Sequence, residues 1–309
     1  MAKRELAGPG DTCFPDERKA GYRPPHTIQA PSSDADLQAV YEWLLSQSIV
    51  EQLTVSVDDA IRYVLDGART WRFDLSSPKV DSDERSSVGT KLQYHVIEQL
   101  GLEKKPPLDT AIVGVAVEIK GTVRKTWMIP REGQCEITLM IQIDAEKHCF
   151  RALLMRVHRA WLTGKKGNRD LKRSPAAQAV RDYALEVAPW TRLPAEPLRL
   201  LSTQQLAVVF GPEGQVKRIT ALFGYLPEVV IPRSTIETVG AKRKDVMRRA
   251  RESKPHVLQK HGLVVLVGTW RLDYEVARKL KHDLRDEAWV AVPTEKLAEL
   301  GYTPSEFAH

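Results

Sequence analysis

The amino-acid sequence predicts a mixed α/β (α+β) protein built from two domains. Apolar residues fall at helical spacing over much of residues 34–100, and three strand-like runs follow between residues 111 and 161. Helices followed by a group of strands are typical of a mixed core. The second half has several short helices, then a basic helix and a run rich in valine and leucine. A length of 309 residues is enough for two domains that each bury a core.

Three helices are predicted in the first half. Residues 1–33 are rich in Gly, Pro, Ser and charge and predict an extended arm with little structure of its own. The first helix begins at Asp34, and either Ser33 or Asp34 can cap it. Its apolar face is formed by Leu37, Val40, Trp43 and Leu44. The second is expected over Ser56–Leu65. The third covers Ser87–Leu100 and ends at the following glycine.

Three strands are predicted after these helices. Ala111–Lys120 is dense in Val and Ile, Cys135–Ile143 alternates apolar and polar residues, and Phe150–Trp161 is a third apolar run. Together with the helices they define a first domain over residues 34–162.

The charge of the chain points to a polyanionic partner. The net charge is +6 at pH 7, and nucleic acid is the commonest partner of such proteins. No run is apolar enough to cross a bilayer, and the N-terminus lacks the apolar core of a signal peptide, so a cytoplasmic protein without membrane contact is expected.

The second half begins with a polar, basic segment over residues 163–175, interpreted as a linker or a DNA-facing loop. Residues 176–309 form the predicted second domain. Its first helices are expected over Ala176–Val187, Ser202–Phe210 and Gly214–Gly224.

The three cysteines, Cys13, Cys135 and Cys149, lie far apart in the sequence and form no Cys-x-x-Cys pair. This spacing argues against a zinc site, and the odd count argues against a disulfide framework. Buried thiols are the expectation.

The sharpest chemical pattern is Asp109 followed by Glu118 and Lys120. Glu118 and Lys120 are two apart on a predicted strand, so they share a face, opposite an apolar face that carries Val115, Val117 and Ile119. Two carboxylates can hold Mg²⁺ against a phosphate, and a lysine can stabilise the developing negative charge. The alternative is a solvated strand edge with no catalytic role, because this spacing also occurs by chance.

A basic helix is the main pattern of the second half. Pro232–Gly240 predicts a short helix, residues 243–253 a second helix, and residues 256–267 a hairpin around Lys260. This order is typical of a winged helix-turn-helix, in which the second helix enters the major groove. The residues expected at DNA are Arg243, Lys244, Arg248, Arg249, Arg251 and Lys260, together with Asn168, Arg169 and Lys172 of the preceding loop. The alternative is a basic, solvated helix.

The chain resembles the NaeI family of type II restriction endonucleases. The stretches that carry the resemblance occur in the same order and at compatible spacing; they are Leu65–Thr70, Gly89–Thr90, Asp109 with Gly114–Lys120, Trp127–Pro130, Asn168–Arg173, Gly214–Val216, Leu222–Phe223, Val246–Arg249 and His261–Gly268. Together they span about residues 57 to 268.

This resemblance implies an N-terminal endonuclease domain of the PD-(D/E)xK kind and a C-terminal winged helix like that of catabolite activator proteins. It also implies a homodimer in which each domain holds a DNA duplex. On the family pattern Asp109 and Glu118 bind the metal and Lys120 is the catalytic lysine. The family glutamate on the preceding helix corresponds here to Gln93, which supplies no negative charge.

Three functions remain open from the sequence. The first is a Mg²⁺-dependent endonuclease that cuts double-stranded DNA at a specific site. The second, which Gln93 favours, is a DNA-binding protein without cleavage. The third is a modification-dependent nuclease or a nicking repair enzyme on the same scaffold.

Overall fold

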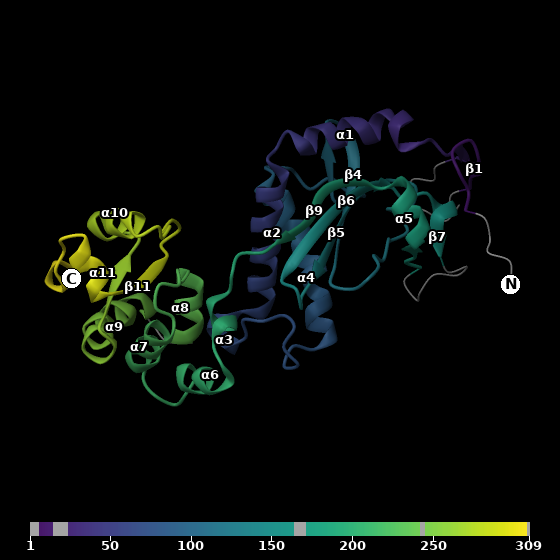
Figure 1. Cartoon of the computed structure of the whole chain (residues 1–309). Coiled ribbons are helices and arrows are strands. Elements are labelled where there is room, and N and C mark those ends of the chain that lie inside the picture. Colours follow the sequence, from purple (N-terminus) through teal and green to yellow (C-terminus); the bar gives the residue numbers. More distant parts are fainter. Residues whose placement is uncertain (1–5, 15–23, 164–170, 242–244, 308–309) are drawn as a thin grey trace. The chain divides into compact units, whose positions relative to one another are not determined.

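The structure is a computed structural model that describes residues 6–14, 24–163, 171–241 and 245–307. The chain divides into two compact units (Figure 1). The first unit comprises Met1–Val64 and Val80–Pro194, and the second unit comprises Leu65–Lys79 and Ala195–His309.

A five-stranded mixed sheet forms the centre of the first unit, in agreement with the predicted α/β class. Its strands lie in the order β3 (Thr110–Ile112), β4 (Val115–Thr122), β5 (Ile137–Asp144), β6 (Cys149–Arg156) and β9 (Leu185–Arg192). Only β4 and β5 are parallel; the other neighbours are antiparallel. Almost every residue of β5 is buried, as expected for a central strand covered on both faces.

The helices of the first unit are α1 (Ala35–Leu45), α2 (Ile49–Leu65) and α4 (Ser82–Gln99). Asp34 caps α1 as predicted, because its side chain accepts the main-chain N–H of Leu37. Asp81 caps α4 in the same way through two main-chain N–H groups. This acidic cap places the start of α4 five residues before the predicted Ser87.

Three further boundaries in the first unit differ from the sequence prediction. Helix α2 begins at Ile49 rather than Ser56. The run from Ala111 to Lys120 is two strands, separated by a turn in which Val113 and Gly114 both have positive φ. Helix α5 (Ala177–Tyr183) is shorter than predicted, because the chain then becomes β9 and pairs with β6.

The described residues of the N-terminal segment, 6–14 and 24–33, are packed into the first unit rather than extended from it. Strands β1 (Thr12–Cys13) and β2 (His26–Thr27) pair antiparallel. Cys13 and Ile28 are buried in a cluster with Trp127, Cys135 and Trp161. A two-stranded pair, β7 (Leu162–Thr163) with β8 (Ser174–Pro175), lies within the segment that was interpreted as a linker.

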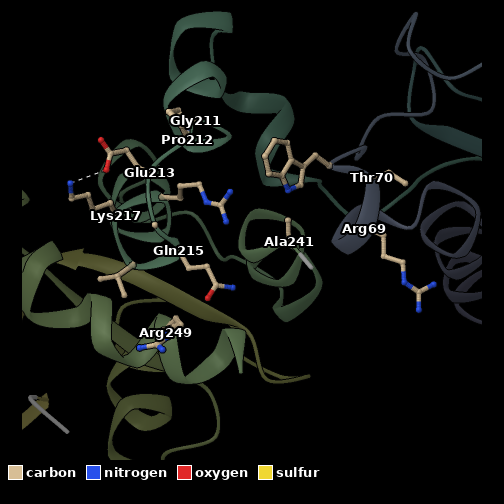
Figure 2. Close-up of a pocket in the computed structure, with 13 residues that line it drawn as sticks. Arg69, Thr70, Gly211, Pro212, Glu213, Gln215, Lys217, Ala241 and Arg249 are labelled. Atoms are coloured by element: carbon tan, nitrogen blue, oxygen red, sulfur yellow. Dashed lines mark hydrogen bonds and ion pairs between the residues drawn. The ribbon is translucent and has the colours of Figure 1, made fainter. Parts of the chain in front are cut away.

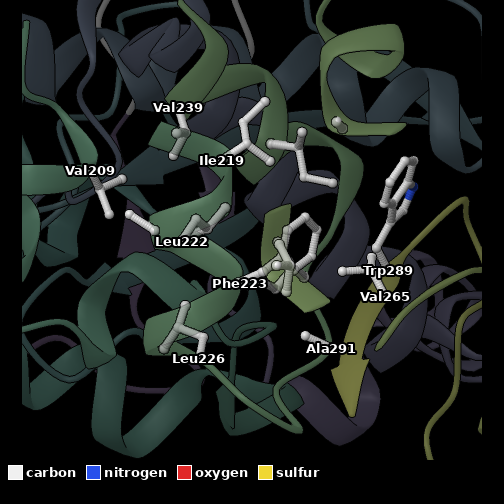
Figure 3. Packing of buried hydrophobic residues seen from close by; sticks show 14 of the residues in the cluster. Val209, Ile219, Leu222, Phe223, Leu226, Val239, Val265, Trp289 and Ala291 are labelled. Atoms are coloured by element: carbon white, nitrogen blue, oxygen red, sulfur yellow. The ribbon is translucent and has the colours of Figure 1, made fainter. Parts of the chain in front are cut away.

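The second unit is a helical domain with a small sheet. Its helices are α3 (Gly67–Thr70), α6 (Thr203–Val209), α7 (Gln215–Tyr225), α8 (Arg233–Gly240), α9 (Val246–His261), α10 (Arg271–Lys279) and α11 (Thr294–Glu299). Strands β10 (Leu263–Val267) and β11 (Trp289–Pro293) pair antiparallel. Phe223 of α7 and Trp289 of β11 meet in the core of this unit (Figure 3).

The predicted hairpin over residues 256–267 is wrong. Residues 256–261 continue α9, which includes Pro255, and the chain reverses only at Gly262 with φ +64. Strand β10 pairs with β11, on the far side of α10 in the sequence. A tightly connected hairpin is therefore replaced by two strands joined through a helix.

The boundary between the units also differs from the predicted division at residues 163–175. Strand β9 extends the sheet, so the first unit continues to Pro194. Residues 65–79 belong to the second unit, where Phe73 packs on its core and Gly67 lies against Thr238. No helix in the described part of the chain is long and apolar enough to cross a membrane.

Candidate active site and nucleic-acid interface

Glu118 and Lys120 of β4 form an ion pair on one face of the sheet, with 2.8 Å between Lys120 Nζ and Glu118 Oε1. Only 3% of Glu118 is exposed. A carboxylate with this degree of burial is not part of a solvated strand edge, because an ordinary surface charge stays in water. The burial of Glu118 therefore argues against the alternative that this pair is a solvated strand edge.

Asp109 lies beside this pair. It directly precedes β3, whose register pairs Thr110 with Val117, so residue 109 faces residue 118 across the two strands. Its Oδ2 accepts the main-chain N–H of Ile119 at 2.9 Å, and the residue is 7% exposed. The structure thus brings together the three residues selected from the sequence.

Burial is the main influence on the ionisation of Glu118, and it opposes the charged form. Burial raises its pKa, the charges of Asp109 and Glu132 raise it further, and Lys120 acts in the opposite direction. Glu132 was not selected from the sequence because it lies in a turn rather than on a strand. The next residue, Gly133, packs against Glu118, since a β-carbon on Gly133 would lie 3.3 Å from Glu118 Cγ.

Helix α4 brings Gln93 to the same region. Gly89 of α4 and Gly121 of β4 approach so closely that a β-carbon on Gly89 would lie 2.5 Å from the Gly121 carbonyl oxygen. Gln93 is one turn further along this helix. Gln93 and Lys120 line one cavity of about 510 Å³.

This cavity carries additional positive charge. Arg124 and Lys172 also line it, so Lys172, selected from the sequence as a DNA contact, lies in the same cavity as Lys120. Asn168 and Arg169 lie outside the described residues. A cleft with cationic walls beside buried carboxylates is suited to a phosphate ester.

The second candidate surface is the exposed face of α9 in the second unit. Ala250 is buried, and Val246 and Met247 pack against the core of this unit as predicted. Arg248, Arg249, Arg251 and Lys260 are exposed on this helix. Glu252 is paired with both Arg248 and Arg249. Arg243 and Lys244 lie outside the described residues.

A basic pocket of about 1080 Å³ adjoins this helix within the second unit (Figure 2). Its charged lining residues are Arg69, Glu213, Lys217, Arg218 and Arg249. Glu213 is paired with Lys217 at 2.8 Å, so the lining keeps a net positive charge. Arg69, Lys217 and Arg218 were not selected from the sequence, because they become neighbours of α9 only in the folded unit.

Comparison with known proteins identifies one family. No curated protein matches the chain. The family model described as restriction endonuclease NaeI matches residues 50–296, which include Asp109, Glu118 and Lys120, the cavity beside Lys120, the basic pocket and α9. The chain belongs to the NaeI restriction endonuclease family and is accordingly a type II site-specific deoxyribonuclease.

Proposed function

We propose that this endonuclease depends on Mg²⁺ and that Asp109, Glu118 and Lys120 form its cleavage centre. The observation that carries this proposal is the burial of two carboxylates side by side, with a lysine ammonium 2.8 Å from one of them. Burying two neighbouring carboxylates costs free energy of folding, and a bound divalent cation would reduce the repulsion between them.

The donor set fits Mg²⁺. Asp109 and Glu118 offer hard carboxylate oxygens, the ligands that this ion prefers, and Gln93 offers a neutral amide oxygen in the cavity that Lys120 also lines. When bound, the ion would polarise the scissile phosphate and favour ionisation of the attacking water. The family glutamate is replaced by Gln93 in this chain. Glu132 adds a negative charge near Glu118.

The residues of the chain have distinct tasks in this proposal. The N–H of Ile119 orients the Asp109 carboxylate, which is thereby held ready for the cation. The Lys120 ammonium stabilises negative charge that develops on the phosphate during attack. Arg124 and Lys172 attract the DNA backbone into the cavity.

We also propose that the second unit is a winged helix that binds a DNA duplex through α9. Helices α7, α8 and α9 are followed by β10, α10 and β11, and Ile231, which precedes α8, bridges to Trp289 of β11. A helix-turn-helix followed by a small antiparallel sheet is typical of winged helices, and in this unit α10 lies between the two strands in the sequence. The resemblance to the family favours a homodimer with one duplex on each domain.

A cleavage assay tests the proposal for the first unit. The full chain is incubated with plasmids of varied sequence in Mg²⁺, in Ca²⁺ and in chelator, and DNA binding is measured in Ca²⁺. We expect discrete cleavage products in Mg²⁺ only. Equal cleavage in chelator would contradict the metal requirement.

The second candidate function is DNA binding with weak or absent cleavage. Gln93 favours it, because an amide at this position leaves the site with less negative charge for holding a cation. Specific binding in Ca²⁺ without cleavage of methylated or unmethylated plasmid in Mg²⁺ would support this candidate. Gln93→Glu should then create or increase cleavage, whereas Gln99→Glu on the same helix should not.

A further inference from the structure

Two cysteines and two histidines, none of them part of the proposed cleavage centre, converge in the first unit. One ligand atom from each of Cys13, His26, Cys135 and His158 lies within 4.8 Å of the other three. Cys13, Cys135 and His158 are buried, and His26 is partly buried. The prediction that the thiols are buried is confirmed. The prediction against a zinc site rested only on the spacing of the cysteines in the sequence.

The fold brings these residues from two separate parts of the chain. Cys13 and His26 face one another in the register of β1 and β2. Cys135 lies two residues before β5, and His158 lies two residues after β6, the antiparallel neighbour of β5. One pair of residues therefore lies on paired strands and the other lies just beyond the ends of paired strands, an arrangement that holds ligands at fixed positions.

Cys135 has a backbone conformation that points to a local requirement. Its φ is +68, a region that residues other than glycine rarely adopt. Its N–H donates to the Val157 carbonyl at 2.7 Å, which fixes this conformation next to His158. Unusual backbone of this kind persists where the surrounding structure determines it, and it is common at ligand sites.

Two distances within the group are close to those of tetrahedral coordination. The two Sγ atoms of Cys13 and Cys135 are 3.7 Å apart. Two thiolates on one tetrahedral zinc ion, each about 2.3 Å from it, would be about 3.8 Å apart, whereas a disulfide needs about 2.05 Å. His26 Nε2 and His158 Nδ1 are 3.0 Å apart, close to the roughly 3.3 Å expected for two imidazoles on the same ion.

Surrounding main-chain groups orient the ligands. His26 Nδ1 lies 3.3 Å from the Pro24 carbonyl, so a proton on Nδ1 leaves the Nε2 lone pair directed at the group. The Arg159 N–H donates to Cys135 Sγ at 3.4 Å, which stabilises a thiolate. Second contacts of this kind are typical of metal sites.

We propose that Cys13, His26, Cys135 and His158 form a structural Zn²⁺ site that fastens the N-terminal β1–β2 pair to the central sheet. Four protein ligands of the thiolate and imidazole type form a closed site, which is structural rather than catalytic. The site is chemically distinct from Asp109 and Glu118, whose oxygen ligands favour Mg²⁺. It does not depend on the proposed cleavage mechanism.

Metal analysis of the purified full chain tests this site. The protein is produced with zinc in the medium, freed of any tag and loosely bound metal, and compared with Cys13→Ser, Cys135→Ser and His158→Gln. We expect one zinc ion per wild-type chain and loss of most of it in each variant. Cys149→Ser is the matched control, because Cys149 is buried but outside the group; it should keep its zinc, as should Asp109→Asn.

Cobalt substitution of the wild-type protein gives a second readout that needs no variant to fold. The expected spectrum has the intense ligand-field bands of a tetrahedral ion and a thiolate-to-cobalt charge-transfer band. Two results would overturn the proposal: purified wild-type protein that contains no zinc, or cobalt-substituted wild-type protein whose spectrum lacks this charge-transfer band. So would full zinc content in both serine variants, or a Cys13–Cys135 disulfide in the native protein by mass spectrometry.

Discussion

Gly89 of α4 and Gly121 of β4 lie backbone against backbone, and this contact sets the distance between the helix of Gln93 and the strand of Lys120. A β-carbon on Gly89 would lie 2.5 Å from the Gly121 carbonyl oxygen, and one on Gly121 would lie 2.9 Å from Gly89 Cα. Any larger residue at either position must push the helix away from the sheet.

Gly89→Ala should therefore damage both stability and cleavage. Overpacking of a close contact typically costs about 1–3 kcal/mol, and displacement of α4 would also widen the cavity between Gln93 and Lys120. Urea denaturation and plasmid cleavage measure the two effects. Glu98→Ala, on the exposed face of the same helix, is the control. A Gly89→Ala protein with wild-type stability and rate would show that the contact does not position the site.

The arginines of α9 give a prediction about DNA binding. If Arg248 and Arg249 contact bases, replacing either with alanine should weaken binding by about 1–3 kcal/mol. Glu252→Gln should have the opposite effect, because its charge now pairs with both arginines and repels phosphate. Fluorescence anisotropy with a DNA duplex in Ca²⁺ measures both changes.

Arg271→Ala is the control for this experiment, since Arg271 is an exposed, ion-paired arginine on α10. Its loss should leave the affinity nearly unchanged. Equal affinities for wild type, Arg248→Ala and Arg249→Ala would place the DNA surface elsewhere on the protein.

Lys254 gives a prediction about pH. Its Nζ is buried 3.8 Å from Asp273 Oδ2 and 4.1 Å from the centre of the Trp270 ring. Burial outweighs the attraction of Asp273 and lowers the pKa of Lys254 to about 8, from 10.5. Between about pH 8 and pH 10.5, Lys254 is protonated in the unfolded chain but has lost its proton in the folded chain. The contribution of Lys254 to the free energy of unfolding therefore rises with pH over this range.

Comparison with Lys254→Met isolates this contribution. Relative to that variant, wild-type protein should become more stable as the pH is raised from about 8 towards 10.5, as measured by urea denaturation. Lys260→Met, an exposed lysine of the same helix, controls for general effects of charge. A difference between wild type and Lys254→Met that does not change with pH would contradict the assigned pKa shift.

The sequence was most informative where residues interact locally. Glu118 and Lys120 are two residues apart on β4, so alternation along the chain was enough to place them on one face. Asp109 was selected from the pattern that it forms with these two residues, and the turn after β3 that brings it opposite Glu118 was not predicted. The cap at Asp34 was predicted because its partner is three residues away. The amphipathic face of α9 also follows from local spacing.

Features that depend on distant contacts were not predictable. Cys13 meets Cys135 across 122 residues, and no spacing rule indicates this contact. Strand β10 finds its partner beyond α10, which made the local hairpin over residues 256–267 a plausible but wrong interpretation. Residues 65–79 belong to the second unit because Phe73 packs on its core, a contact absent from the local pattern.

The most direct measurement for the proposed cleavage centre is the single-turnover rate of DNA cleavage in Mg²⁺ for Asp109→Asn and Glu118→Gln. The cleavage rate of each variant should fall by about a hundredfold or more, because each substitution removes a charged ligand from the buried site. Binding of DNA in Ca²⁺ should be retained in both variants. Glu146→Gln, an exposed carboxylate of the same unit, should cleave at the wild-type rate. Wild-type rates in the Asp109 and Glu118 variants would contradict the assignment of these carboxylates to the cleavage centre.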